Sequence, residues 1–268
     1  MADKISLTQA VRGNLLSLQR TSTGIDQTQT RLSTGLRVSS AIDDAAAFFT
    51  ARAFDNRASD LESLKSNIDL AISTIQAAID GIDAITDIVQ QAKGIASAAK
   101  ATGDTNERST LAVQFNELLS QINSIANDST FNGLNLLQAS PDNLAVEFNE
   151  DNTSNLTITG LDATTATSGI NIAVAANNFG LNANIDTALT SISSALTTLR
   201  SNASTLGSNN TILTTRLDFT KNLVNTLETG SGKLTLADLN EESANLLALQ
   251  TRQQLGLNSL ALASQSER

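Results

Sequence analysis

The chain has 268 residues, with no Cys, His, Trp or Tyr and a single proline, Pro141. It therefore lacks the commonest general base, the thiol nucleophile and the usual zinc ligands, so we expect neither an enzyme nor a cofactor or metal site. The net charge of −10 and a pI of about 4.4 argue against binding to nucleic acid, which requires a basic face.

The chain carries no signal for membrane insertion. No window approaches 18 consecutive uncharged apolar residues, and residues 1–6 contain no apolar core of a secretory signal. We therefore expect neither a membrane span nor a cleaved signal peptide. Residues 1–140 and 142–268 are free of proline, which permits long helices on both sides of Pro141.

The N-terminal segment carries an amphipathic helical stripe whose apolar residues recur in steps of three or four, with polar interruptions at 22 and 29. The stripe consists of Leu7, Val11, Leu15, Leu18, Ile25 and Leu32. Gly35 follows as a helix stop. Ser40 to Asp43 matches a capping box, and Asp44 adds negative charge where a new helix begins.

The next helix has the period of a coiled coil. Leu, Ile and Val recur over residues 61–89 with a mean step of 3.5 residues. Gly103 ends this helix, and Asp104 with Glu107 predicts a capped start for another, which carries apolar residues over 111–125.

Residues 139–180 have β character. Residues 144–148 and 156–159 alternate apolar and polar side chains around a turn-prone segment, and 170–174 predicts a third strand. Phe131-Asn132-Gly133 predicts a tight turn ahead of this region. The region is too small for an independent domain.

The second helical half, residues 185–227, repeats apolar residues with four-three spacing. Asn210 and Thr220 occupy seam positions, where polar residues fix register. Gly230 and Gly232 predict the end of this helix. A last helix from about residue 235 carries Leu239, Leu246, Leu249, Leu257 and Leu260.

This order predicts a mainly α protein. Long antiparallel coiled-coil helices would form a rod, with the β-hairpin region at its hairpin-like tip. The terminal helices, roughly 1–34 and 235–264, would form only a two-helix pair, which is marginal alone. A fully buried Leu or Ile contributes roughly 1.5–3 kcal/mol, so the uncovered face of this pair predicts contacts with other subunits.

One motif resembles a known family. Residues 31–46 spell Arg-Leu-Ser-Thr-Gly-Leu-Arg-Val-Ser-Ser-Ala-Ile-Asp-Asp-Ala-Ala. This stretch is similar, at each fixed position, to the bacterial flagellin pattern Arg-Leu-Ser-x-Gly-x-Arg followed by Ser-Ala-x-Asp-Asp-Ala-Ala. Phe131-Asn132-Gly133 before Leu136 and Leu137, and the leucine-rich C-terminal helix, extend the resemblance over essentially the whole chain.

The resemblance implies a short flagellin without outer variable domains. Such a subunit is exported unfolded through the flagellar channel and self-assembles into the extracellular filament used for swimming. Residues 1–42 and 232–268 would form a discontinuous inner-core domain, and 43–231 a coiled-coil domain that includes 139–180. Implied partners are further copies, flagellar cap and hook–filament junction proteins, and an export chaperone at the C-terminal helix. Alternative interpretations are a junction protein itself, or a monomeric coiled-coil adhesin or immune ligand.

Two sets of site residues follow. The filament interface would comprise the N-terminal stripe and the five C-terminal leucines. Arg31, Arg37, Asp43 and Asp44 would either cap a helix stop and restart within one chain, or form inter-subunit ion pairs. Exposed pairs contribute roughly 0–1 kcal/mol, so such pairs would set register rather than affinity. Adjacent carboxylates on a helix point about 100° apart, a poor geometry for acid–base catalysis.

Overall fold

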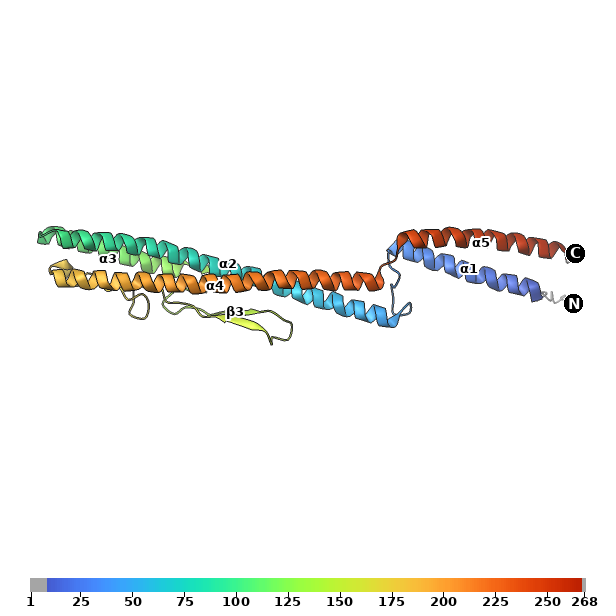
Figure 1. Cartoon of the computed structure of the whole chain (residues 1–268), viewed down its shortest axis with the longest axis horizontal. Helices are drawn as coiled ribbons and strands as arrows, with labels where there is room; N and C mark the ends of the chain where they lie inside the picture. Colours follow the sequence, from blue (N-terminus) through green and yellow to red (C-terminus); the bar gives the residue numbers. More distant parts are fainter. Residues whose placement is uncertain (1–8, 267–268) are drawn as a thin grey trace. The chain divides into compact units, whose positions relative to one another are not determined.

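The computed structural model describes residues 9–266, and its elements are mainly helical, as predicted (Figure 1). In chain order they are α1 (Gln9–Thr34), α2 (Ala45–Ala101), α3 (Thr105–Asp128), β1 (Thr130–Phe131), β2 (Leu134–Asn135), β3 (Leu144–Glu147), β4 (Asn155–Ile158), the 3₁₀ helix η1 (Ala176–Phe179), α4 (Asn182–Thr235) and α5 (Leu239–Ser266). Contacts divide the chain into a terminal unit, residues 1–58 and 225–268, and a central unit, residues 59–224.

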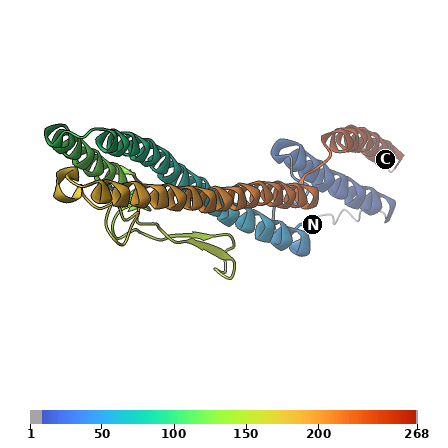
Figure 2. The same cartoon turned by 60° about the vertical axis from the view of Figure 1, so that its left-hand side comes forward.

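Three helices pack side by side in the central unit (Figures 1 and 2). Their seams follow the predicted heptads. On α2 the core includes Ile68, Ile75, Ile82, Ile85 and Val89, and on α4 it includes Ile185, Ile192, Leu199, Leu206 and Leu213. Five alanines of α2 belong to the same core cluster: Ala71, Ala78, Ala92, Ala96 and Ala99. Because alanine is short, these positions bury apolar surface without the bulk of a leucine or isoleucine.

Side chains of α3 hold the irregular segment that leads to α4. Phe115 and Phe179 are fully buried and meet edge to face, with ring centroids 5.2 Å apart. The Asn116 Oδ1 accepts a hydrogen bond from the Ala175 N–H at 2.9 Å. The Asn123 Oδ1 accepts from the backbone N–H and the hydroxyl of Thr165. These amides satisfy backbone groups that no strand or helix pairs.

The chain reverses direction between α2 and α3. Asp104 is the N-cap of α3, and its side chain accepts a hydrogen bond from the Asn106 N–H at 2.8 Å, as the predicted cap requires. The start of α4 lies at the same end, because Lys100 pairs with Asp186 at 2.5 Å and Arg108 donates to the Asn182 side chain at 2.6 Å.

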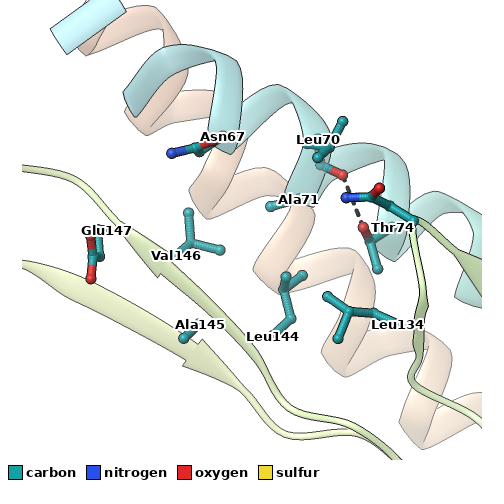
Figure 3. Close-up of a pocket in the computed structure, with 10 residues that line it drawn as sticks. Asn67, Leu70, Ala71, Thr74, Leu134, Leu144, Ala145, Val146 and Glu147 are labelled. Carbon is teal, nitrogen blue, oxygen red and sulfur yellow. Dashed lines mark hydrogen bonds between the residues drawn. The ribbon is translucent and has the colours of Figure 1, made fainter. Parts of the chain in front are cut away.

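Two small antiparallel hairpins follow α3. Asn132 and Gly133 both adopt positive φ, of 50° and 79°, and form the predicted tight turn between β1 and β2. Leu144 pairs with Ile158 in the β3–β4 hairpin. Buried Leu144 and Val146 face α2 across a cavity of about 210 Å³ whose helix side includes Leu70 and Ala71 (Figure 3).

The structure corrects three sequence predictions. The β3–β4 hairpin lies along the side of α2, not at the end where the helices reverse, because its apolar face packs beside residues 67–74. Residues 170–174 are not a strand, since the Ile170 and Ile172 N–H groups bond to loop carbonyls. Gly230 and Gly232 do not end α4. At Gly230 the missing Cβ instead leaves room for the Phe54 ring, 3.3 Å from where that atom would lie.

The two polar seam positions of α4 differ in their surroundings. Thr220 is buried, and the Asn210 Oδ1 is a buried acceptor without a hydrogen-bond partner. An unpaired buried acceptor costs about 1–3 kcal/mol. Asn210 therefore lowers the stability of the helix seam at its position, as the sequence predicts for a polar residue there.

Candidate functional site

The terminal unit is built around an antiparallel pair of helices, α1 and α5. Asn14 near the start of α1 donates to the Ser259 hydroxyl near the end of α5, at 3.5 Å. Arg31 near the end of α1 meets Glu242 near the start of α5, at 2.9 Å. Beyond this pair, residues 36 and 236 form an isolated bridge, so the two segments stay together where both helices end or begin.

The seam of α1 is more polar than predicted. The positions that face α5 recur in steps of three and four: Val11, Asn14, Leu18, Thr21, Ile25, Thr28 and Leu32. Thr21 and Thr28 are buried. Of the predicted stripe, Val11, Leu18, Ile25 and Leu32 lie in the seam, Leu15 is exposed, and Leu7 lies outside the described residues.

Two glycines explain why the seam of α1 contains Thr21 and Thr28 and not Leu15. An added Cβ at Gly256 would lie 2.9 Å from Leu18 Cδ2, and one at Gly24 would lie 3.4 Å from Leu249 Cδ1. Each helix thus places a leucine over a glycine of the other helix. This reciprocal packing brings the backbones close together and orients small Thr side chains, rather than Leu15, towards α5.

Arg31 and Arg37 both have partners within the chain. The Glu242 side chain is about 10% exposed and pairs with the 37%-exposed Arg31 side chain. The cation lies near the C-terminus of α1 and the carboxylate near the N-terminus of α5, so each complements a helix dipole. The Arg37 guanidinium donates to the Leu234 carbonyl oxygen at 3.0 Å.

We expect exchange of the Arg31–Glu242 charges to show whether this pair sets the register of α1 on α5. Arg31→Glu would place two carboxylates in contact and weaken the helix pair by about 1–3 kcal/mol, which an earlier midpoint in denaturant unfolding of α1 and α5 would show. Arg31→Glu combined with Glu242→Arg should recover most of this loss. Arg20→Glu, on an exposed position of α1, is the matched control. Equal defects in the single and double variants would contradict a pairwise role.

Asp43 and Asp44 both act within the chain. The Asp43 Oδ2 accepts hydrogen bonds from the backbone N–H groups and the hydroxyls of Ser39 and Ser40, at 2.9–3.1 Å. The backbone bonds from Ser40 and Ser39 lower the pKa of Asp43, so this turn loses stability as the pH falls through that lowered pKa. Asp44, rather than the predicted Ser40, caps α2: its Oδ1 accepts from the Ala47 N–H at 3.0 Å.

The side of α5 that faces away from α1 is an uncovered leucine surface. We define the outer leucine face as Leu247, Leu255 and Leu262, of which Leu255 and Leu262 are 64% and 67% exposed. Among the predicted leucines, Leu246, Leu249 and Leu260 are partly buried towards α1, whereas Leu239 and Leu257 are exposed. The sequence prediction omitted the outer leucine face, although its steps of eight and seven residues form a second helical stripe.

The charge of the chain is segregated between the units. The terminal unit contains ten acidic and ten basic residues, and the central unit contains seventeen acidic and seven basic residues, which together account for the net charge of −10. Terminal units of different copies can therefore approach without net repulsion.

Within residues 9–266 no helix is long and apolar enough to cross a bilayer, and no three carboxylates gather as metal ligands. Helices with heptad seams, joined to a helix pair with an uncovered leucine face, are typical of structural proteins that contact further subunits.

Comparisons with known proteins identify the family. The bacterial flagellin N-terminal helical region matches residues 5–142, and the C-terminal helical region matches residues 189–267. Flagellin FljM of Caulobacter vibrioides is 34% identical over 95% of this chain and 93% of its own length. A flagellin of Brucella melitensis is 30% identical over 94% and 92%. The crystal structure of Bacillus cereus flagellin shares the fold, with a TM-score of 0.51 at 19% identity over 57% of this chain and 88% of that one.

The chain belongs to the bacterial flagellin family. It is a structural subunit of a flagellar filament, which lies outside the cell, and its family is one of structural proteins that self-assemble. Its short length fits a form without a variable domain.

Proposed function

We propose that the outer leucine face of α5 is a principal contact between copies in the filament. The observation that carries the proposal is the exposure of Leu247, Leu255 and Leu262 on a helix whose opposite side already packs on α1. Covering these side chains would add about 1.5–3 kcal/mol for each leucine. Exposed apolar stripes of this kind mark interaction sites.

The predicted division into domains remains part of the proposal. Residues 1–42 and 232–268 would form the inner core of the filament, and residues 43–231 would form the surrounding coiled-coil domain. The neutral charge of the terminal unit supports its place where copies pack most densely. The connection between α1 and α2 would then set the register between neighbouring subunits. It is held in place by Arg31, Arg37, Asp43 and Asp44.

The remaining partners are those that membership of the flagellin family implies. Before assembly an export chaperone would cover the leucines of α5, and cap and hook–filament junction proteins would bind at the two ends of the filament. The chain would pass the export channel unfolded and without a cleaved signal peptide. The assembled filament would serve swimming motility, with no catalytic role.

Assembly of the purified full-length chain tests the proposal. Monomers seeded with filament fragments should give long filaments in electron micrographs, and hydrogen exchange of α1 and α5 should slow on assembly. Short or absent polymers would favour a junction protein or a monomeric ligand instead.

A further inference from the structure

A rigid turn in the terminal unit presents an isoleucine to solvent. Ile42 is 96% exposed and lies in the turn that precedes α2. The four hydrogen bonds to Asp43 and the cap at Asp44 fix the backbone on its C-terminal side. These bonds form the turn and cap α2, and they also hold Ile42 where a second molecule can reach its side chain.

The exposed surface continues along the first turns of α2. Ala45, Ala46, Phe49 and Ala53 are exposed and follow Ile42 at helical spacing. Phe49 is 63% exposed, and its ring meets the Phe48 ring edge to face at 5.5 Å. We call Ile42, Phe49 and the alanines between them the apolar knob. Two large apolar side chains surrounded by small alanines resemble the centre of a protein interface, where a few large side chains contribute most of the binding free energy.

A groove of matching character lies elsewhere in the same unit. It is a shallow, open groove of about 630 Å³ around the end of α4 and the start of α5, with Gly232, Leu236 and Ala237 as its apolar lining. Leu236 is exposed. Hydrogen bonds from Arg37 and Val38 to the Thr235 carbonyl, and from Ala237 to the Gly35 carbonyl, hold this groove in shape. We call it the Leu236 groove.

We propose that the apolar knob of one copy docks into the Leu236 groove of a second copy. Each edge carries two acidic residues and one basic residue, so the two surfaces can meet in an orientation that forms opposite-charge pairs. Lys233 lies at the groove and can meet the acidic Asp43 and Asp44 beside the knob. Glu228 and Asp238 lie at the groove as well, and Arg52 is exposed one turn beyond Phe49. Such pairing would fix the orientation of the contact, while the apolar side chains supply the attraction.

The arrangement joins two different surfaces of the same chain. A contact of this heterologous kind leaves a free knob at one end and a free groove at the other, so it propagates into an open helical polymer. The inference rests on the proposed self-assembly, and it adds a second contact that is separate from the outer leucine face of α5.

Disulfide cross-linking tests the contact, since the chain has no cysteine of its own. Full-length Ile42→Cys and Ala237→Cys chains are mixed in equal amounts, assembled and treated with a mild oxidant. A disulfide requires Cα atoms within about 7 Å, so it forms only where the surfaces meet. We expect a covalent dimer whose cross-linked peptides contain positions 42 and 237. Thr50→Cys, exposed on the same turn of α2 as Phe49, replaces Ile42→Cys in the control mixture.

The outcomes separate this inference from the proposed function. Filaments in which the 42–237 link stays at the level of the 50–237 control would overturn the knob contact and leave self-assembly intact. Failure of the unmodified chain to polymerise would overturn both. Independently, Ile42→Asn should raise the critical concentration about tenfold, as expected for loss of an interface anchor, whereas Ile42→Leu should stay near the parent value. An unchanged critical concentration in Ile42→Asn would count against the knob.

Discussion

A chain carrying Leu255→Asp and Leu262→Asp should fold as a monomer and fail to form filaments. Both leucines are about two-thirds exposed in the single chain, where surface substitutions change stability by less than about 0.5 kcal/mol. In the filament, each substitution would remove about 1.5–3 kcal/mol of apolar burial and place a charge in a desolvated interface. Because 1.4 kcal/mol corresponds to a factor of ten, the critical concentration should rise at least about a hundredfold.

The controls for this variant separate charge from apolar contact. Gln254→Asp adds a carboxylate at an exposed position next to Leu255 and should assemble almost normally. Leu255→Met with Leu262→Met keeps apolar side chains of similar volume and should stay close to the parent protein. Circular dichroism establishes that each monomer is folded, and sedimentation gives the critical concentration. Filament formation by the double-Asp variant at parental concentrations would show that assembly leaves this face in water.

The fold of the central unit could be predicted because the apolar residues of its long helices recur with a single heptad period. Large aliphatic residues recur at heptad positions of α2 and α4, and in the structure they lie in the core or pack against it. The buried alanines of α2 escaped prediction, because alanine is common on both exposed and buried faces and so provides no contrast. The irregular segment before α4 escaped as well, since its backbone bonds to Asn116 and Asn123, partners that no local pattern reveals.

The candidate site could be predicted only in part. On α1, positions 11, 18, 25 and 32 share one heptad position, and the second seam position could be either four or three residues further along. Hydrophobicity favours the first choice, which contains Leu15. The structure adopts the second, which contains Thr21 and Thr28, because Leu18 and Leu249 pack over glycines of the opposite helix.

On α5 the pattern is hard to interpret because the helix has more leucines than one stripe can contain. They lie on two sides of the helix, so no single stripe contains Leu246, Leu249 and Leu260 together with Leu255 and Leu262. A helix that is apolar on two sides needs two partners. Within the chain α1 supplies one of them, and we propose that another copy supplies the second, which would link this fold to a polymer.

Phe115→Ala should destabilise the central unit by about 3–5 kcal/mol, a large share of the stability of an ordinary domain. The Phe115 side chain is fully buried in α3 and packs edge to face on Phe179, which is also fully buried. Removing the ring would leave a cavity and would also loosen the segment that α3 holds before α4. Denaturant unfolding followed by circular dichroism should show an earlier midpoint for the central helices.

Two further substitutions test whether this loss comes from packing. Phe219→Ala removes a ring that is largely exposed on α4, so it should change stability by less than about 0.5 kcal/mol. Phe115→Leu keeps most of the apolar volume and should cost less than Phe115→Ala. If Phe115→Ala and Phe219→Ala shifted the midpoint equally, the buried pair of rings would not be a principal source of stability, and the connection from α3 to α4 would have to be held mainly by the Asn116 and Asn123 hydrogen bonds.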